Sequence, residues 1–385
     1  MATSDDESGS SWASLTSSWS SRKRRKTRHF DRRSLGRSRD VPGVSSDDSS
    51  LNGEKHDFFP TPWEIEDLED VGVLFAKDPI SMNEMLERLK GNTRIDFPSF
   101  VKTFSDFVKE ALSFSYNIDE FHQLRSNAPK YSRKELTQTL DRVNVNLLAL
   151  EKRWKATVHE YVDKESDEEL FHRLIGFFSM RVFCFIQSLR DYIRKIREKN
   201  DGSYKGLMKK FTEMLFLDPG DDESSRTEMV IRNKKVGRKP DVRYWEMSSE
   251  GEDTGGLVML TEVKHSPFTP ITSEDGIWIE SRLKREVLGQ IGAELLTECD
   301  NSFCPGIVLG IVCMRTEIIF VMLNISLKHY NAIIGNKDID GECATINYSR
   351  SYDILNVADR EEIVGTLLWL ACVQKKNLHQ YYLGE

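Results

Sequence analysis

An uninterrupted apolar run, Leu257-Val258-Met259-Leu260, constrains the fold of this chain more than any other feature. Because the run does not alternate between apolar and polar residues, it predicts a strand buried on both faces within a layered unit. The strand continues into Glu262 and Lys264, which share one face because they are two positions apart. Charged groups at the end of such a strand are costly unless they are paired or bind a metal. Earlier in the chain, Pro240-Asp241 supplies another carboxylate at the start of a second strand.

The neighbouring segments predict an α/β domain. Three strands with Gly and Ser at their joins are expected to form an antiparallel meander. A helix precedes the meander, and a second helix with apolar residues at helical spacing follows it and carries Gln290 and Glu294 on neighbouring faces. Two more strands complete the unit. The expected ranges, in chain order, are 204–217, 227–233, 242–247, 257–264, 279–299, 306–313 and 318–324.

Pro-Asp followed by Glu-x-Lys, in this succession of elements, resembles the PD-(D/E)XK superfamily of metal-dependent nucleases over residues 204–325. The resemblance implies a restriction-endonuclease-like core and hydrolysis of phosphodiester bonds in nucleic acid, foremost DNA, with Mg²⁺ or Mn²⁺. It implies that Asp241, Glu262 and the carbonyl of Val263 are the metal ligands, since Mg²⁺ prefers hard oxygen donors. Lys264 would orient or deprotonate the attacking water, or stabilise the phosphorus centre as a cation.

In this superfamily the first core helix often supplies another acidic residue, and the second often supplies a glutamine. Glu213 and Gln290 are the nearest matches in this chain. The resemblance therefore implies that Glu213 joins the metal ligands and that Gln290 joins the catalytic group. Glu228 is an alternative to Glu213, and the sequence does not decide between them.

Other interpretations stay open at this point. Asp241 can be a turn residue and Glu262 with Lys264 a structural ion pair, in an inactive nuclease-fold scaffold or in a DNA-binding or interaction protein. The acidic hairpin expected at 248–256 would repel phosphate if it lies near the site. His265 is expected to be a structural or exposed histidine rather than a substrate contact.

Residues 1–55 are Ser-rich and contain too few apolar groups to bury a core, so they are expected to form a disordered arm. The arm contains the basic run Arg22–Lys26. This run predicts a nuclear import receptor as a partner and a nuclear location, with the cytoplasm as the alternative. The net charge of −8 argues against a protein that coats nucleic acid with a uniformly basic surface.

Residues 56–200 are expected to form a helical region, and residues 201–385 the nuclease-like α/β domain. Side-chain caps are expected at the starts of two long helices and of a final helix. These caps are Ser132 with Glu135, Ser166 with Glu169, and Asp359 with Glu362.

No apolar segment is long enough to span a bilayer, so no membrane association is expected. The six cysteines lack the CxxC spacing and companion histidines of a zinc site, and they are expected to be reduced thiols. Many proteins of the superfamily pair two active sites, so a homodimer is an open alternative for this chain.

Overall fold

The computed structural model describes residues 63–93, 99–113, 169–194, 201–220, 227–231, 234–247, 253–264, 266–269 and 278–376, with single positions between 132 and 156. These residues all belong to one compact unit, Asp57–Glu385. The expectations for the N-terminal arm with Arg22–Lys26, for His265 and for the cap at Ser166 lie outside the described residues.

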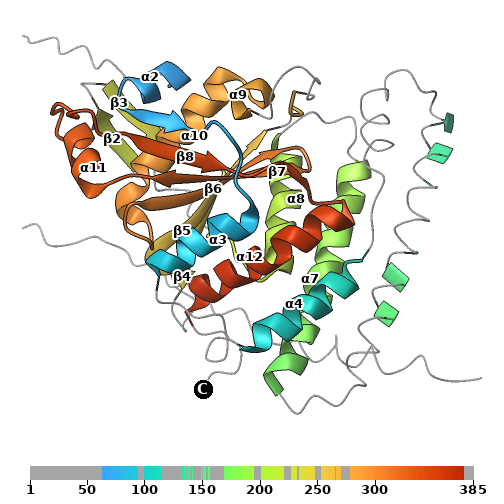
Figure 1. Cartoon of the computed structure of the whole chain (residues 1–385). Coiled ribbons are helices and arrows are strands. Elements are labelled where there is room, and N and C mark those ends of the chain that lie inside the picture. Colours follow the sequence, from blue (N-terminus) through green and yellow to red (C-terminus); the bar gives the residue numbers. More distant parts are fainter. Residues whose placement is uncertain are drawn as a thin grey trace, which may run out of the picture. The chain divides into compact units, whose positions relative to one another are not determined.

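A mixed, open β-sheet forms the centre of this unit (Figure 1). Within the described ranges the sheet has seven strands in the order β1-β8-β7-β6-β5-β4, and β9 pairs with β7. The pairs β5–β6 and β1–β8 are parallel, and the others are antiparallel. The strands are β1 (Val73–Phe75), β4 (Val242–Met247), β5 (Asp253–Lys264), β6 (Ile307–Met314), β7 (Glu317–Asn324), β8 (Ala344–Tyr348) and β9 (Tyr352–Asp353).

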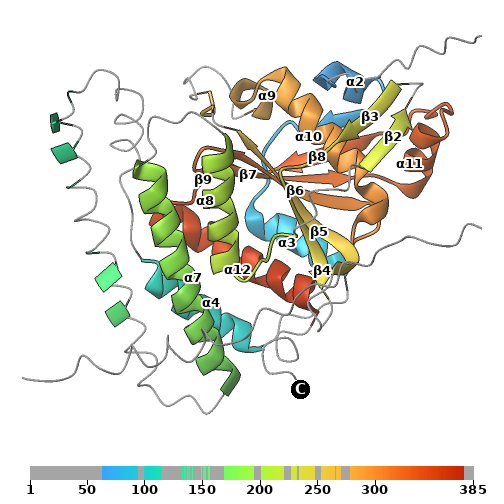
Figure 2. The ribbon, with the colours of Figure 1, turned by 180° about the vertical axis from the view of Figure 1, so that it is seen from behind.

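Helices cover both faces of the sheet (Figures 1 and 2), as the doubly apolar run in β5 predicted. Leu260 packs in the core beneath one group of helices, whereas Met259 and Val263 pack in the core beneath the other. On the Leu260 side lie α2 (Ile65–Glu69), α9 (Ile279–Arg282), α10 (Arg285–Thr297) and α11 (Leu327–Ile334). On the Val263 side lie α3 (Met82–Asn92), α4 (Ser99–Ala111), α7 (Glu169–Arg194), α8 (Asp201–Met214) and α12 (Val357–Lys375).

Most of the expected core elements are confirmed, but the second helix is divided. The residues between α9 and α10, Leu283 and Lys284, have ψ angles of 146° and 147°. These extended conformations interrupt the helix that the sequence predicted over 279–299. Because of this interruption, α10 begins at Arg285 as a separate helix, and Gln290 lies in its second turn.

The predicted three-strand meander is wrong. The first of its strands, β2 (Thr227–Ile231), forms a separate two-stranded sheet with β3 (Lys234–Arg238). The physical reason is local: Ile231 pairs with Lys234, only three positions later in the chain, so the nearest partner of β2 is the strand that directly follows it. Only the second and third predicted strands, β4 and β5, pair as expected.

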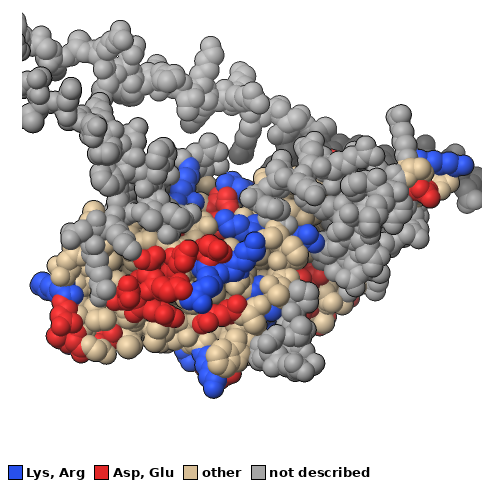
Figure 3. Space-filling model, turned by 90° about the horizontal axis from the view of Figure 1, so that it is seen from above, with Lys and Arg blue, Asp and Glu red and all other residues tan. Residues whose placement is uncertain are grey.

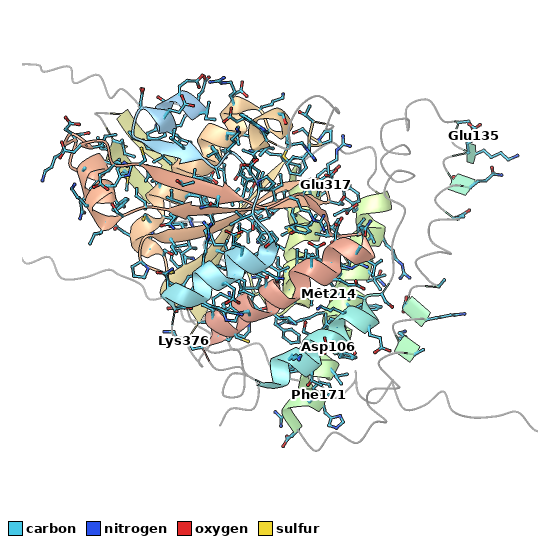
Figure 4. The ribbon with its side chains drawn as sticks, in the orientation of Figure 1. Asp106, Glu135, Phe171, Met214, Glu317 and Lys376 are labelled. Carbon is cyan, nitrogen blue, oxygen red and sulfur yellow. The ribbon has the colours of Figure 1, made fainter. Side chains whose placement is uncertain are left out.

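The expected boundary at residue 200 lies inside the compact unit Asp57–Glu385. Helices α4 and α7 share one hydrophobic core with α8, α12 and the sheet. Their contact includes the rings of Phe104, Phe171 and Phe178, and Figure 4 labels Phe171 on α7 and Asp106 on α4. β1, also from the expected helical region, pairs with β8 at the edge of the sheet. The described elements before residue 200 therefore form part of the α/β fold.

Two helix caps are settled by hydrogen bonds. The capping box of Ser132 and Glu135 is confirmed, because each backbone N–H donates to the other residue's side chain. The predicted cap of the final helix is wrong: Asn356 caps α12 by accepting from the Ala358 N–H at 2.9 Å. Asp359 and Glu362 instead bind the guanidinium of Arg350, at 2.6 Å each.

The cysteines and the apolar character of the helices were also predicted from the sequence. All six cysteines are free thiols, and four of them are buried. None of the described helices combines the length and apolar character needed to cross a bilayer.

Candidate active site

The antiparallel pairing of β4 with β5 brings two predicted residues together. Val242 pairs with Thr261, so the next step along the ladder sets Asp241 opposite Glu262. The N–H of Val263 donates a hydrogen bond to Asp241 Oδ2 at 2.9 Å. Two carboxylates from different strands therefore meet at one end of the sheet.

Glu262 is the buried member of this pair, with 3% of its side chain exposed. Its Oε1 accepts a hydrogen bond from Lys264 Nζ on the same strand face. The same oxygen accepts from Gln290 Nε2 of α10 at 2.6 Å. The Asp241 and Lys264 side chains remain 28% and 25% exposed, so solvent reaches the group from outside. All four predicted catalytic residues are thus neighbours.

A further carboxylate, Glu294, extends the group. Glu294 lies one turn after Gln290 on α10 and is fully buried. The Gln290 amide that binds Glu262 also donates to Glu294 Oε1 at 2.9 Å. Sequence reasoning placed Gln290 and Glu294 on one helix but did not assign Glu294 to the site. The available signal was an acidic residue inside an otherwise apolar helix segment, which is costly unless it has polar partners.

Burial and charge determine the protonation of the central pair. Burial raises the pKa of Glu262, and the nearby charge of Asp241 raises it further, although Lys264 and Gln290 oppose the shift. Burial lowers the pKa of Lys264, but the charges of Glu262, Glu294 and Asp241 outweigh burial, so that its pKa is raised. Lys264 is therefore an ammonium at neutral pH. Of the two roles expected for it, this state favours the cation over the general base.

Glu213 lies apart from the group. Its carboxylate forms an ion pair with Lys210 at 2.5 Å on the same helix. The residue of α8 that reaches Asp241 is Lys205, whose Nζ is 3.6 Å from Asp241 Oδ1. Glu213 follows Lys205 by eight positions, or about 12 Å along the helix axis. The alternative, Glu228, lies on β2 in the separate two-stranded sheet. Neither placement supports a metal ligand from this part of the chain.

The remaining predicted ligands fit a magnesium ion. Within the residues that the structure describes, no group of three or more His, Cys, Asp or Glu side chains forms a metal site. Mg²⁺ does not need such a group, because it is commonly held by one or two carboxylates with water and substrate phosphate. Asp241 and Glu262 supply two carboxylates that lie together at the sheet edge.

The backbone of β5 adds a third oxygen. The Arg315 N–H donates to the carbonyl of Lys264 from the β6 side, at 3.0 Å. Because backbone groups of successive strand residues point to opposite neighbours, the carbonyl of Val263 points the other way. Its N–H already binds Asp241 on that side. Asp241, Glu262 and the Val263 carbonyl are therefore the residues that would hold the ion.

The described part of the predicted acidic hairpin lies far from the site. Asp253 of the predicted acidic hairpin pairs with Met247 at the opposite end of the β4–β5 ladder, about 30 Å along β5 from Glu262. Glu250 and Glu252 lie outside the described residues. The final helix, α12, packs in the core with Val263, on the other face of the sheet from Glu262.

The chain matches no protein-family model, no curated protein and no solved structure.

Proposed function

We propose that this protein is a metal-dependent nuclease that hydrolyses phosphodiester bonds in nucleic acid, foremost DNA. The observation that carries the proposal is the meeting of Asp241 and Glu262 across the β4–β5 ladder, with Lys264 and Gln290 on the same Glu262 oxygen. The elements α8, β4, β5, α10 and β6 resemble a restriction-endonuclease-like core. The resemblance departs from that core at the first meander strand, which pairs outside the main sheet.

Each residue has a distinct part in the proposed reaction. When bound, Mg²⁺ would lower the pKa of a ligand water and neutralise charge on the phosphate oxygens. Asp241 and Glu262 would hold that ion with their carboxylates, and Gln290 keeps Glu262 in place through its amide. Lys264, as an ammonium, stabilises negative charge that develops on the phosphate oxygens in the transition state. Mn²⁺ has similar oxygen ligands and would serve in place of Mg²⁺.

A non-catalytic scaffold that binds nucleic acid is the second candidate. It is favoured by the ion pairs of the site, in which Lys205 accompanies Asp241 and Lys264 accompanies Glu262. Such pairs satisfy both carboxylates without a metal. This candidate predicts binding of nucleic acid without cleavage.

Cleavage of labelled DNA and RNA, single- and double-stranded, tests the proposal directly. The full chain is incubated with each substrate in Mg²⁺, Mn²⁺ or EDTA, beside Asp241→Asn and Lys264→Ala. We expect metal-dependent cleavage that falls about 100-fold or more in both variants, since each removes a group that acts in the transition state. Lys102→Ala, which removes an exposed lysine from α4, is the matched control and should keep full activity.

The outcomes separate the candidates. Cleavage that persists in Asp241→Asn would contradict the assignment of the site. Metal-independent binding without any cleavage by folded wild type would favour the scaffold.

A further inference from the structure

Lys205 lies on α8, the helix from which the superfamily often supplies an acidic residue, and its position is well defined. The neighbouring α8 side chains Tyr204, Leu207 and Met208 are fully buried in the core. Their packing fixes the rotation of the helix and turns Lys205 toward the β4 edge. Lys205 keeps 36% of its side chain exposed, and its Nζ lies 3.6 Å from Asp241 Oδ1. This separation is an ion pair without a hydrogen bond, so the ammonium is free to approach another anion.

From this arrangement, and resting on the proposed nuclease function, we propose that Lys205 is a second cationic side chain of the site, beside Lys264. In this proposal one divalent ion binds Asp241 and Glu262, and the Lys205 ammonium contacts a phosphate oxygen of the substrate where a two-metal enzyme would use another ion. The flexible four-carbon stem of lysine allows Nζ to move from Asp241 to a phosphate when the carboxylate binds metal.

The charge of the site supports a single ion. Three carboxylates, Asp241, Glu262 and Glu294, lie together with two lysines, Lys205 and Lys264. One divalent ion offsets the remaining negative charge, whereas a second would leave a strongly positive centre. Two-metal sites hold their ions a few ångströms apart with shared carboxylates. Within the described residues, no three His, Cys, Asp or Glu side chains are arranged to hold a metal ion together.

The surface charges indicate the side from which phosphate approaches. Figure 3 shows acidic residues gathered on the face over α2, where Glu64, Glu66, Glu69 and Asp70 are exposed. The acidic patch would repel a polyanion. The α8 side of the site instead offers Lys205, followed one turn later by the partly exposed Lys209. A nucleic-acid backbone is therefore expected along α8 and the β4 edge.

Metal binding tests the inference without requiring cleavage. Isothermal titration with Mn²⁺ is performed on the full chain, on Lys205→Ala, on Lys205→Glu and on the Lys102→Ala control. We expect one Mn²⁺ per wild-type chain, and about tenfold tighter binding in Lys205→Glu, because a competing cation becomes a further carboxylate near the ion. Lys205→Ala should bind Mn²⁺ at least as tightly as wild type, because only the competing charge is lost.

Binding of a short DNA duplex without divalent metal supplies the second measurement. We expect Lys205→Ala to weaken this binding severalfold and to reduce its salt dependence, since one phosphate contact is lost. Lys102→Ala should change neither property. Circular dichroism confirms that each variant is folded.

The two binding measurements and the cleavage assay distinguish the role of Lys205 from the nuclease function. Two Mn²⁺ ions per wild-type chain, no Mn²⁺ binding, or Lys205 variants that match wild type in both measurements would overturn the role of Lys205. Nuclease activity with unaltered Lys205 variants would overturn this inference alone. Absence of cleavage together with the expected Mn²⁺ and DNA effects would overturn the nuclease proposal and leave Lys205 as a phosphate-binding residue beside a single-ion site.

Discussion

At the scale of single residues, Asp353 shows how folding changes the acidity of a side chain. Asp353 pairs with Glu317 across β7 and β9, and its backbone N–H donates to Asp359 Oδ2 at 2.9 Å. Burial, followed by the charges of Glu317 and Asp359, raises the pKa of Asp353 to about 7, although the Leu355 N–H and Arg360 oppose the shift. Ionisation of this carboxyl therefore costs free energy in the folded protein.

The pH dependence of stability tests this assignment. A carboxyl whose pKa rises on folding contributes stability that is complete below its unfolded value of 3.8 and is lost as pH rises through about 7. Asp353→Asn keeps an oxygen for the Leu355 N–H but cannot ionise. We expect the variant to exceed wild type in free energy of unfolding at pH 8, by at most about 4 kcal/mol, and to lose this advantage below pH 4.

Urea denaturation at pH 4, 6 and 8 measures the difference. The control is Asp70→Asn, at an exposed position on the C-terminal side of α2. An advantage of Asp353→Asn that is constant across this range would contradict the shifted pKa.

The spacing of residues in the sequence predicts some residues of the candidate site and not others. The i, i+2 relation placed Glu262 and Lys264 on one face, and this relation holds on any strand. Asp241 was predicted from its place before a strand. Lys205 was not predicted because its role depends on the rotation of α8 and on its alignment with β4, and neither is encoded by local spacing. Glu213 has the residue type that the superfamily favours, but it lies too far along the same helix.

At the scale of elements, the contact of α10 with α2 positions Gln290. A Cβ atom on Gly289 would overlap the backbone of Trp63 and Glu64, and one on Gly292 would overlap Leu68. The two glycines therefore allow α2 to approach α10 closely, directly beside the residue that holds Glu262. Gly365 on α12, in contrast, has open space where a Cβ would stand.

This difference predicts opposite effects of the same substitution. Gly289→Ala should lower the free energy of unfolding by about 2 kcal/mol, because the extra atom forces the helices apart. Gly365→Ala should raise it by about 0.5–1 kcal/mol, because alanine restricts the unfolded chain and favours helix. Urea denaturation measures both variants, and equal effects would contradict the close approach of α2 and α10.

Strands were predicted well from the local pattern of apolar residues. Strand pairing was predicted less well, because more than one strand can be the partner. The strands 242–247, 306–313 and 318–324 have structural counterparts within a residue or so of their predicted ends. The pairing of β2 was missed because a hairpin partner followed it directly and was closer than β4. The break at Leu283 was missed because its apolar spacing continues that of α10, whereas the backbone is extended there.

At the scale of the whole molecule, the described helices and sheet depend on one another. Arg360 of α12 donates to the carbonyl of Leu112 at the end of α4, at 2.7 Å, and is almost fully buried. Phe107 of α4 and Phe178 of α7 lie in the core that contains Phe211 of α8. Elements on both sides of residue 200 share this core. Composition distinguishes helix-rich from strand-rich segments but does not show which segments share a core.

Fragments of the chain test this dependence. Residues 57–385 should unfold in urea as one cooperative transition, with the same midpoint by tryptophan fluorescence and far-ultraviolet circular dichroism. Residues 201–385 alone should show no cooperative transition, because the apolar sides of α8 and α12 would face water. A cooperative, native-like transition of the shorter fragment would contradict the shared core.

The position of Asp241 at the start of β4 has a dynamic consequence. Within the described part of the sheet, β4 pairs on one side only, with β5. Local opening of an edge strand costs less free energy than unfolding of the central strands. Separation of β4 from β5 would remove Asp241 from Glu262 while β5, β6 and β7 stay folded. The pair of carboxylates therefore exists only while this one ladder is closed, so its lifetime follows the opening of β4 rather than the unfolding of the protein.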